Sequence, residues 1–199
     1  MTSAIKNNHS LARPASSGSM TASATMIGSR PTLISVPPMK FLIMDAPRQS
    51  NLHLYIKEMK KNSVMDIVRV CEPTYTAGEL VNAGMCLHEM AYEDGHAPPK
   101  PIIDQWLHLV EKIFFNKDEG PTQGKCIAIH CVAGLGRAPA MVALALIEFA
   151  NMDPVEAVAH IRQHRRGAIN EKQLIYLEGY KRSFKRGGAG PEAACCVIL

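Results

Sequence analysis

The 199-residue sequence lacks several patterns that mark common classes of protein. Its six cysteines include no Cys-x-x-Cys pair and show no metal-ligand spacing with the eight histidines. We therefore expect neither a zinc site nor a disulfide-stapled secreted domain. No apolar run approaches the ~20 residues of a membrane-spanning helix, and no secretory signal is evident. One domain with tails, in a reducing compartment, is the expectation.

Acidic side chains are missing from the first 30 residues, which are rich in Ser, Thr and Ala. We interpret residues 1–30 as a disordered extension. The alternative is a mitochondrial transit peptide, which has a similar composition. The threonine at position 2 does not fit an N-myristoylation motif.

Two nucleotide-binding motifs are also incomplete in residues 125–147, KCIAIHCVAGLGRAPAMVALALI. The short apolar run Cys-Ile-Ala-Ile predicts a buried strand, and the Ala/Leu-rich end predicts a buried helix. A Gly-x-Gly follows the strand, but Pro139 stands where a dinucleotide fingerprint needs its third glycine. No Gly-Lys-Ser/Thr follows, which excludes a Walker loop.

The loop between this strand and helix suits a tetrahedral dianion. Backbone N–H groups converge at a helix N-terminus, where the helix dipole adds partial positive charge. The Arg137 guanidinium matches phosphate oxygens. Cys131 lies at the floor of the loop, and the amides, Arg137 and His130 are expected to favour its thiolate. A buried structural thiol is the alternative. The predicted phosphate-binding residues are Val132, Ala133, Gly134, Leu135, Gly136 and Arg137.

Strands alternate with helices along the chain, which predicts an α/β fold with a mostly parallel central sheet covered by helices on both faces. The expected strands are 33–36, 40–44, 66–71, 86–90 and 125–130. The expected helices are 50–61, 76–85 (with Thr76 as cap and Glu79 at the capping-box position), 101–115, 138–150, 153–166 and 171–184.

The string HCVAGLGRAP, residues 130–139, resembles the signature loop of the protein tyrosine phosphatases. Its Ala-Gly-Leu-Gly-Arg-Ala-Pro form is similar to the prenylated type IVA, or phosphatase of regenerating liver, family. The resemblance covers about residues 33–199. It implies a cysteine-dependent phosphatase fold, in which Cys131 and Arg137 act on phosphotyrosine proteins through a phosphocysteine intermediate without metal or cofactor.

The resemblance also places a general acid at Asp94, because residues 91–99, AYEDGHAPP, are similar to the family's Asp-Asp-Gly-Ala-Pro-Pro loop. Glu93 replaces the first acid, and His96 is an insertion. Glu93 as the acid, or a solvated acidic turn, are the alternatives. By the same resemblance, Cys71 forms a reversible disulfide with the nucleophile; otherwise it is a buried hydrophobe.

Two further positions, Ala138 and Gln173, bear on turnover, and an arginine pair lies near them in the sequence. Most members of the superfamily carry Ser or Thr after the arginine, but here Ala138 follows it, which predicts slow hydrolysis of the phosphocysteine. Gln173 lies where related phosphatases orient the hydrolytic water. The Arg165–Arg166 pair is interpreted as a helix end that is either solvated or functional.

The C-terminal residues Cys-Val-Ile-Leu form a prenylation box at Cys196, and the final Leu favours geranylgeranyl. From His160 onward eight basic side chains stand against three acidic ones, a formal charge of +5, whereas the whole chain carries +4. Aromatic residues are not interleaved with them, so no nucleic acid is expected. We expect a phosphatase domain at 31–184 and a basic, Gly-rich tail at 185–199. Membrane contact is assigned to the prenyl group with Lys181, Arg182, Lys185 and Arg186.

These features predict a protein at the cytoplasmic face of the plasma or endosomal membranes, and in the cytoplasm when unprenylated. The substrate is a phosphotyrosine protein or a phosphoinositide. The rival hypothesis is a membrane-anchored binding module, because the family docks on CNNM-type magnesium transporters. Phosphorylation or oxidation of Cys131 then acts as the switch. The resemblance also implies that homo-oligomers form.

Overall fold

The computed structural model describes residues 1, 26–116 and 124–187. Most of the predicted N-terminal extension and the prenylation box with Cys196 lie outside these residues. In the described part, no helix combines the length and the apolar character needed to span a membrane.

A five-stranded sheet in the order β1-β2-β5-β3-β4 forms the centre of the fold. The strands are β1 (Thr32–Val36), β2 (Met39–Met44), β3 (Val64–Arg69), β4 (Cys86–Glu89) and β5 (Cys126–His130). Only the β1–β2 pair is antiparallel, and the other pairs are parallel. The prediction of a mostly parallel sheet is confirmed. β5 is buried along its whole length because it lies in the middle of the sheet.

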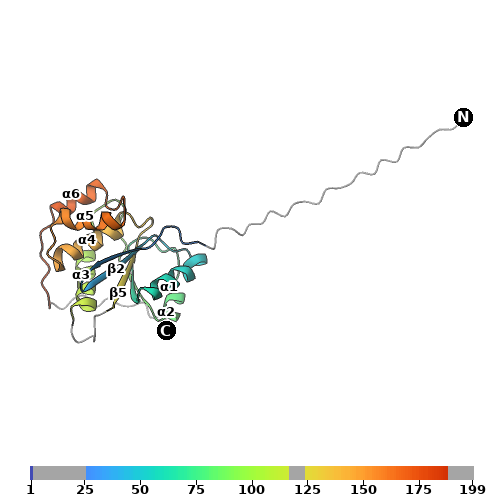
Figure 1. Ribbon diagram of the computed structural model, residues 1–199, viewed down its shortest axis with the longest axis horizontal. Helices are drawn as coiled ribbons and strands as arrows, with labels where there is room; N and C mark the ends of the chain where they lie inside the picture. Colours follow the sequence, from blue (N-terminus) through green and yellow to red (C-terminus); the bar gives the residue numbers. More distant parts are fainter. Residues whose placement is uncertain (2–25, 117–123, 188–199) are drawn as a thin grey trace.

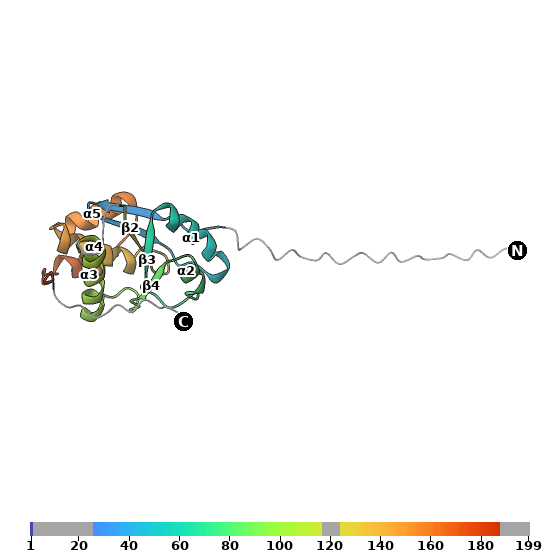
Figure 2. The same ribbon diagram turned by 90° about the horizontal axis from the view of Figure 1, so that it is seen from below.

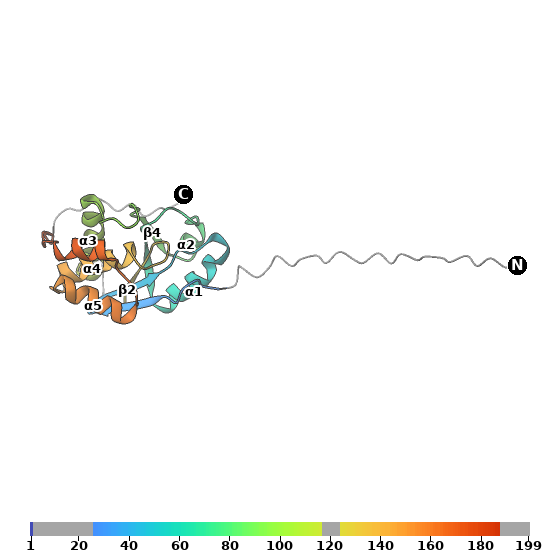
Figure 3. The same cartoon turned by 90° about the horizontal axis from the view of Figure 1, so that it is seen from above.

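Helices cover both faces of the sheet, as predicted (Figure 1; Figure 2). The short η1 (Gln49–Asn51), α1 (Leu52–Lys61) and α2 (Gly78–Asn82) lie on one face, where Leu42, Tyr55 and Leu87 belong to one core cluster. The opposite face carries α3 (Lys100–Phe114), α4 (Arg137–Phe149), α5 (Pro154–His164) and α6 (Glu171–Glu178). Its larger core contains Phe41 and Trp106. Figure 3 shows α3, α4 and α5 on one side of the fold and α1 and α2 on the other. Apolar residues of β2 alternate between the two cores, as the period of a strand requires.

Several predicted boundaries are wrong. α2 begins two residues later than expected, after Ala77, and the capping box at Thr76 does not form. The Thr76 hydroxyl and amide are instead bonded to the side chain of Gln49. α6 ends at Glu178 rather than at residue 184, because the residues that follow it form hydrogen bonds with Glu148 of α4. Glu148 accepts hydrogen bonds from the Tyr180 hydroxyl at 2.7 Å and from the backbone N of Ser183 at 3.0 Å.

The folded domain extends beyond both predicted limits. Residues 26–30 contact the domain, since Arg30 O accepts a hydrogen bond from Arg165. At the other end, the Arg186 guanidinium lies over the rings of Phe115 and Phe149, 4.8 and 5.0 Å from their centres. The backbone N of Gly187 donates to Glu111 at 2.9 Å. Arg186 is therefore anchored on the domain by cation–π contacts and is not part of a loose tail.

Candidate active site

The candidate site lies where the central strand β5 ends. Cys131 follows β5 directly, residues 132–136 form a tight loop, and α4 starts at Arg137. The strand, loop and helix predicted from residues 125–147 are thus confirmed. The parallel neighbours β2 and β3 end at the same edge of the sheet. This edge is where open α/β sheets hold their ligands.

The carbonyl groups of the loop point outward, into hydrogen bonds with the surrounding protein. The backbone N of Ala46 donates to Val132 O at 3.0 Å, and that of Ile169 donates to Leu135 O at 2.6 Å. The carbonyls between them are held by a guanidinium, described below. Because each peptide unit is planar, its N–H points opposite to its C=O. The loop amides are thereby turned toward the space above Cys131, as a phosphate cradle requires.

Glycine is required at position 134 by both conformation and space. Gly134 has a φ of +68°, a region that side chains rarely adopt. A Cβ there would also collide with the carbonyl of Met44 and lie 2.6 Å from Nη2 of Arg165. The loop therefore packs directly on the end of β2.

The Arg165 side chain binds the loop through two backbone carbonyls, a role that its sequence context did not establish. Its side chain is buried, and its Nε donates to Gly134 O at 2.6 Å. Its Nη2 donates to Ala133 O at 3.2 Å. The interpretation of residue 165 as a solvated helix end is wrong. No local pattern distinguishes Arg165 from its exposed neighbour Arg166, so only the tertiary structure identifies it.

Asp94 lies close to Arg137 on the loop between β4 and α3. Its Oδ1 is 3.1 Å from Nε of the arginine, and its side chain is 72% exposed. Tyr92 fastens the same loop: its hydroxyl donates to Arg137 O at 3.1 Å, and its own carbonyl accepts from Arg137 Nη1 at 2.9 Å. The loop departures noted in the sequence remain at the surface. His96 Nδ1 lies 3.1 Å from Asp94 O and 3.7 Å from the Glu93 carboxylate.

Two buried donors at this site have no hydrogen-bond partner among the described residues: Arg137 Nε and Gln173 Nε2. The Arg137–Asp94 contact is thus an ion pair without an aligned hydrogen bond. The Gln173 amide is fixed because its Oε1 accepts from Asn170 N, and its Nε2 lies 3.2 Å from the position of a Cβ on Gly136. Buried donors without acceptors are costly, which indicates a site built for an anion or a water.

His130 does not supply the positive charge that the sequence analysis assigned to it. Burial, followed by the charge of Arg69, lowers the pKa of His130 to about 3. The imidazole is therefore neutral near pH 7. Its Nε2 lies 2.6 Å from the Tyr75 hydroxyl, and its Nδ1 lies 4.0 Å from Sγ of Cys71.

Cys71 is buried in the same core cluster as Cys131. Burial raises the pKa of Cys71 to about 11. The positive charge of Arg137 lowers this pKa in part, and Cys131 raises it further. Cys71 and Cys131 each lie just past the end of one of the neighbouring strands β3 and β5. The structure therefore brings Cys71, Asp94, Cys131 and Arg137 to one edge of the sheet.

Comparisons with known proteins identify relatives of this chain. A family model described as a polymorphic toxin system, DSP-PTPase phosphatase, matches residues 43–151. The PRL-1 phosphatase of Drosophila melanogaster is 48% identical over 76% of this chain and 82% of its own. The protein tyrosine phosphatase type IVA 2 of Mus musculus is 44% identical over 84% of this chain and 96% of its own.

Solved structures show the same fold. A protein tyrosine phosphatase from Leishmania major superposes with a TM-score of 0.70 at 41% identity, over 77% of this chain and all of the other. A kinase-associated phosphatase, at 21% identity and a TM-score of 0.57, shares the fold. The level of identity, the length of the match and the phosphatase domain together place this chain in the type IVA (PRL) family of protein tyrosine phosphatases.

Proposed function

We propose that the chain hydrolyses phosphotyrosine in proteins through a phosphocysteine at Cys131. The observation that carries the proposal is the pair of buried donors without a hydrogen bond, Arg137 Nε and Gln173 Nε2, beside a loop with outward-turned carbonyls; Arg137 Nε is in ion-pair contact with Asp94. The Cys131 thiolate attacks phosphorus, and the S–P bond forms as the bond to the leaving oxygen breaks. Asp94 gives that oxygen its proton. The amides and Arg137 hold the equatorial oxygens.

Water then cleaves the S–P bond and regenerates the thiolate, with Asp94 accepting the proton of the water. Gln173 lies at the edge of the loop, where its free Nε2 orients this water. Ala138 offers no hydroxyl to the departing sulfur. It is fully buried in the core. We therefore propose that the second step is slow and that the phosphocysteine accumulates.

The test is the intact mass of the protein after brief incubation with an aryl phosphate, together with the phosphate released. The proposal expects a phosphoryl adduct that Cys131→Ser abolishes, with release slower than adduct formation. Fast release without an adduct would remove the slow step. The absence of both adduct and release under reducing conditions would refute the catalytic assignment.

A docking function is the second candidate, because apolar side chains surround the cradle. Val132 is 60% exposed and Leu135 is 39% exposed, which is unusual for residues beside a polar site and typical of an interaction surface. We propose that a CNNM-type transporter docks here and that phosphocysteine blocks it. Val132→Asp should abolish this binding, whereas Asp94→Asn should lower turnover and leave binding intact.

Oxidation is proposed as a second switch. Peroxide takes two electrons from the Cys71 and Cys131 thiols, which form a disulfide while the peroxide is reduced to water. Both thiols are free and buried in one cluster, just past the ends of the neighbouring strands β3 and β5, which supports the pairing. Mass spectrometry after mild peroxide treatment should find the linked peptides. Their absence while Cys131 oxidises further would contradict the proposal.

Membrane association is proposed through a prenyl group at Cys196 with the exposed Lys181 and Lys185 as the second signal. Arg182 and Arg186 contribute less, because they contact Asn151 and the Phe115–Phe149 rings. Cys196→Ser should move the protein from the membrane to the soluble fraction of cells. Unchanged fractionation would rule out the prenylation box.

A further inference from the structure

The segment before β1, residues 26–30, is built into the domain, and we call it the N-terminal strap. The backbone N of Ser29 donates to Asp45 Oδ2 at 2.9 Å, and that of Gly28 donates to the Tyr55 hydroxyl at 3.2 Å. Tyr55 is buried and donates its own proton to Asp45 Oδ1 at 2.8 Å. The strap is therefore held at two successive amides by one hydrogen-bonded pair of side chains.

The fit at Gly28 is too close for a larger residue. A Cβ at this position would collide with Asp45 Oδ2. Asp45 cannot turn aside without cost, because each of its oxygens already accepts a hydrogen bond. Asp45 itself directly follows β2 and precedes Ala46, whose backbone N holds the first carbonyl of the phosphate cradle. The strap and the cradle thus share one support.

A second connection runs through the Arg165 guanidinium. Its Nη2 donates to Ser29 Oγ at 3.1 Å, and its Nη1 donates to Arg30 O at 3.1 Å and Thr32 Oγ1 at 2.9 Å. The remaining donors hold the carbonyls of Ala133 and Gly134. Because the guanidinium is a rigid plane, its contacts on the strap fix the direction of its contacts on the cradle.

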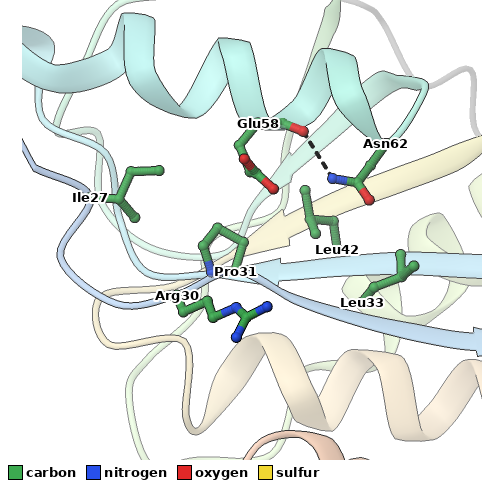
Figure 4. A pocket seen from close by; sticks show the side chains of 7 residues that line it. All are labelled: Ile27, Arg30, Pro31, Leu33, Leu42, Glu58 and Asn62. Atoms are coloured by element: carbon green, nitrogen blue, oxygen red, sulfur yellow. Dashed lines mark hydrogen bonds between the residues drawn. The ribbon is translucent and has the colours of Figure 1, made fainter.

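The other face of the strap takes no part in this network. The Arg30 side chain, with Ile27 and Pro31, lines an open pocket of about 530 Å³. Figure 4 shows α1, with Glu58, on the opposite side of this pocket. Only the backbone of Arg30 reaches Arg165. The strap is consequently positioned by its inner face, where Ser29 is the one strap side chain that bonds to the guanidinium.

We propose that Ser29 is a positioning residue for the phosphate cradle. It holds Arg165 in the plane in which the guanidinium turns the Ala133 and Gly134 carbonyls outward and their neighbouring amides toward the anion. The inference rests on the proposed function only in that the cradle binds a phosphoryl group. The strap is thereby coupled to the affinity of the active site.

The test is the dissociation constant for inorganic phosphate, measured by NMR titration of the full-length protein. Ser29→Ala should weaken phosphate binding by about threefold to tenfold. This is less than the full effect of one lost hydrogen bond to a charged group, because Ser29 acts on the anion only through Arg165. Ser29→Thr, which keeps the hydroxyl, should restore it. As a control, Ser35→Ala should leave phosphate binding unchanged, because Ser35 is exposed on β1. The melting temperature of each variant is the second readout.

A double-mutant cycle with Arg165→Lys separates positioning from a general loss of stability. If Ser29 acts through Arg165, Ser29→Ala will not weaken phosphate binding further in the Arg165→Lys protein. Wild-type affinity in Ser29→Ala, or an equal additional loss in the Arg165→Lys background, would overturn the proposal. Wild-type protein that binds phosphate without turnover would refute the proposed catalysis alone. Wild-type protein that binds no phosphate would refute both.

Discussion

One carboxylate oxygen of Asp94 lies 3.1 Å from Nε of Arg137. The acid and the phosphate-binding cation of the proposed mechanism are therefore adjacent. Tyr92, on the same loop as Asp94, forms two hydrogen bonds with Arg137, one as donor and one as acceptor. Because Asp94 is largely exposed, its position depends on the loop and not on burial. In the proposed mechanism, a phosphoryl group in the cradle accepts a hydrogen bond from Arg137 Nε, and Asp94 protonates the leaving oxygen.

We predict that Asp94→Asn slows phosphorylation of Cys131 by about 100-fold or more for aryl phosphates with basic leaving groups, which need a proton. The loss should shrink as the leaving group becomes more acidic. The measurement is the single-turnover rate across a series of aryl phosphates. Glu93→Gln is the matched control, because Glu93 is directed to His96; an equal loss there would assign the acid role to Glu93.

Ala138→Ser should speed hydrolysis of the phosphocysteine. A hydroxyl placed at the start of α4 can donate to the departing sulfur, and one such bond to a charged group corresponds to about tenfold or more in rate. The measurement is the decay of the phosphoryl adduct by intact mass. Ala140→Ser, equally buried two residues along the same helix, is the control. Equal decay in the wild type and in both variants would show that the missing hydroxyl is not the cause of slow turnover.

Gly134→Ala should destabilise the protein far more than Gly84→Ala. Both glycines have positive φ, +68° and +76°, so both substitutions incur the strain of that conformation, about 1 kcal/mol. A Cβ at Gly84 meets nothing within 4 Å, whereas one at Gly134 collides with Met44 O. We expect a loss of about 3 kcal/mol or more at Gly134, measured by urea unfolding. Equal losses of unfolding free energy in the two variants would mean that the end of β2 shifts to accommodate the new Cβ at little energetic cost.

The buried His130 should make the protein less stable in acid. Its pKa is lowered to about 3 in the folded state, whereas an unfolded histidine titrates near 6.5. Between these values the unfolded chain binds a proton that the folded chain does not, so stability rises with pH by about 1.4 kcal/mol per unit.

Urea unfolding between about pH 4 and pH 6 should therefore show a steeper rise in the wild type than in His130→Asn. The difference should correspond to one proton. Parallel curves would mean that the folded protein protonates His130 as readily as the unfolded chain does.

The sequence was most informative where the site is continuous. Residues 125–147 form strand, loop and helix as predicted. The apolar run, the two glycines and the helix start determine local backbone conformation without help from distant segments. Arg165 and Ser29 were missed since their roles arise only when distant segments meet. The charge state of His130 was predicted wrongly for a similar reason. Its position next to Cys131 in the sequence suggests a cation, but its complete burial lowers the pKa and keeps the imidazole neutral.

The hydrogen bond from Arg165 to Arg30 joins residues 135 positions apart. During synthesis, Cys131 and Arg137 leave the ribosome well before Arg165 and Gln173 do. A nascent chain that ends after α4 therefore carries Cys131 and Arg137 without the guanidinium that holds the loop carbonyls. Contacts of such long range form late in folding, so a competent phosphate cradle is completed only when the domain closes.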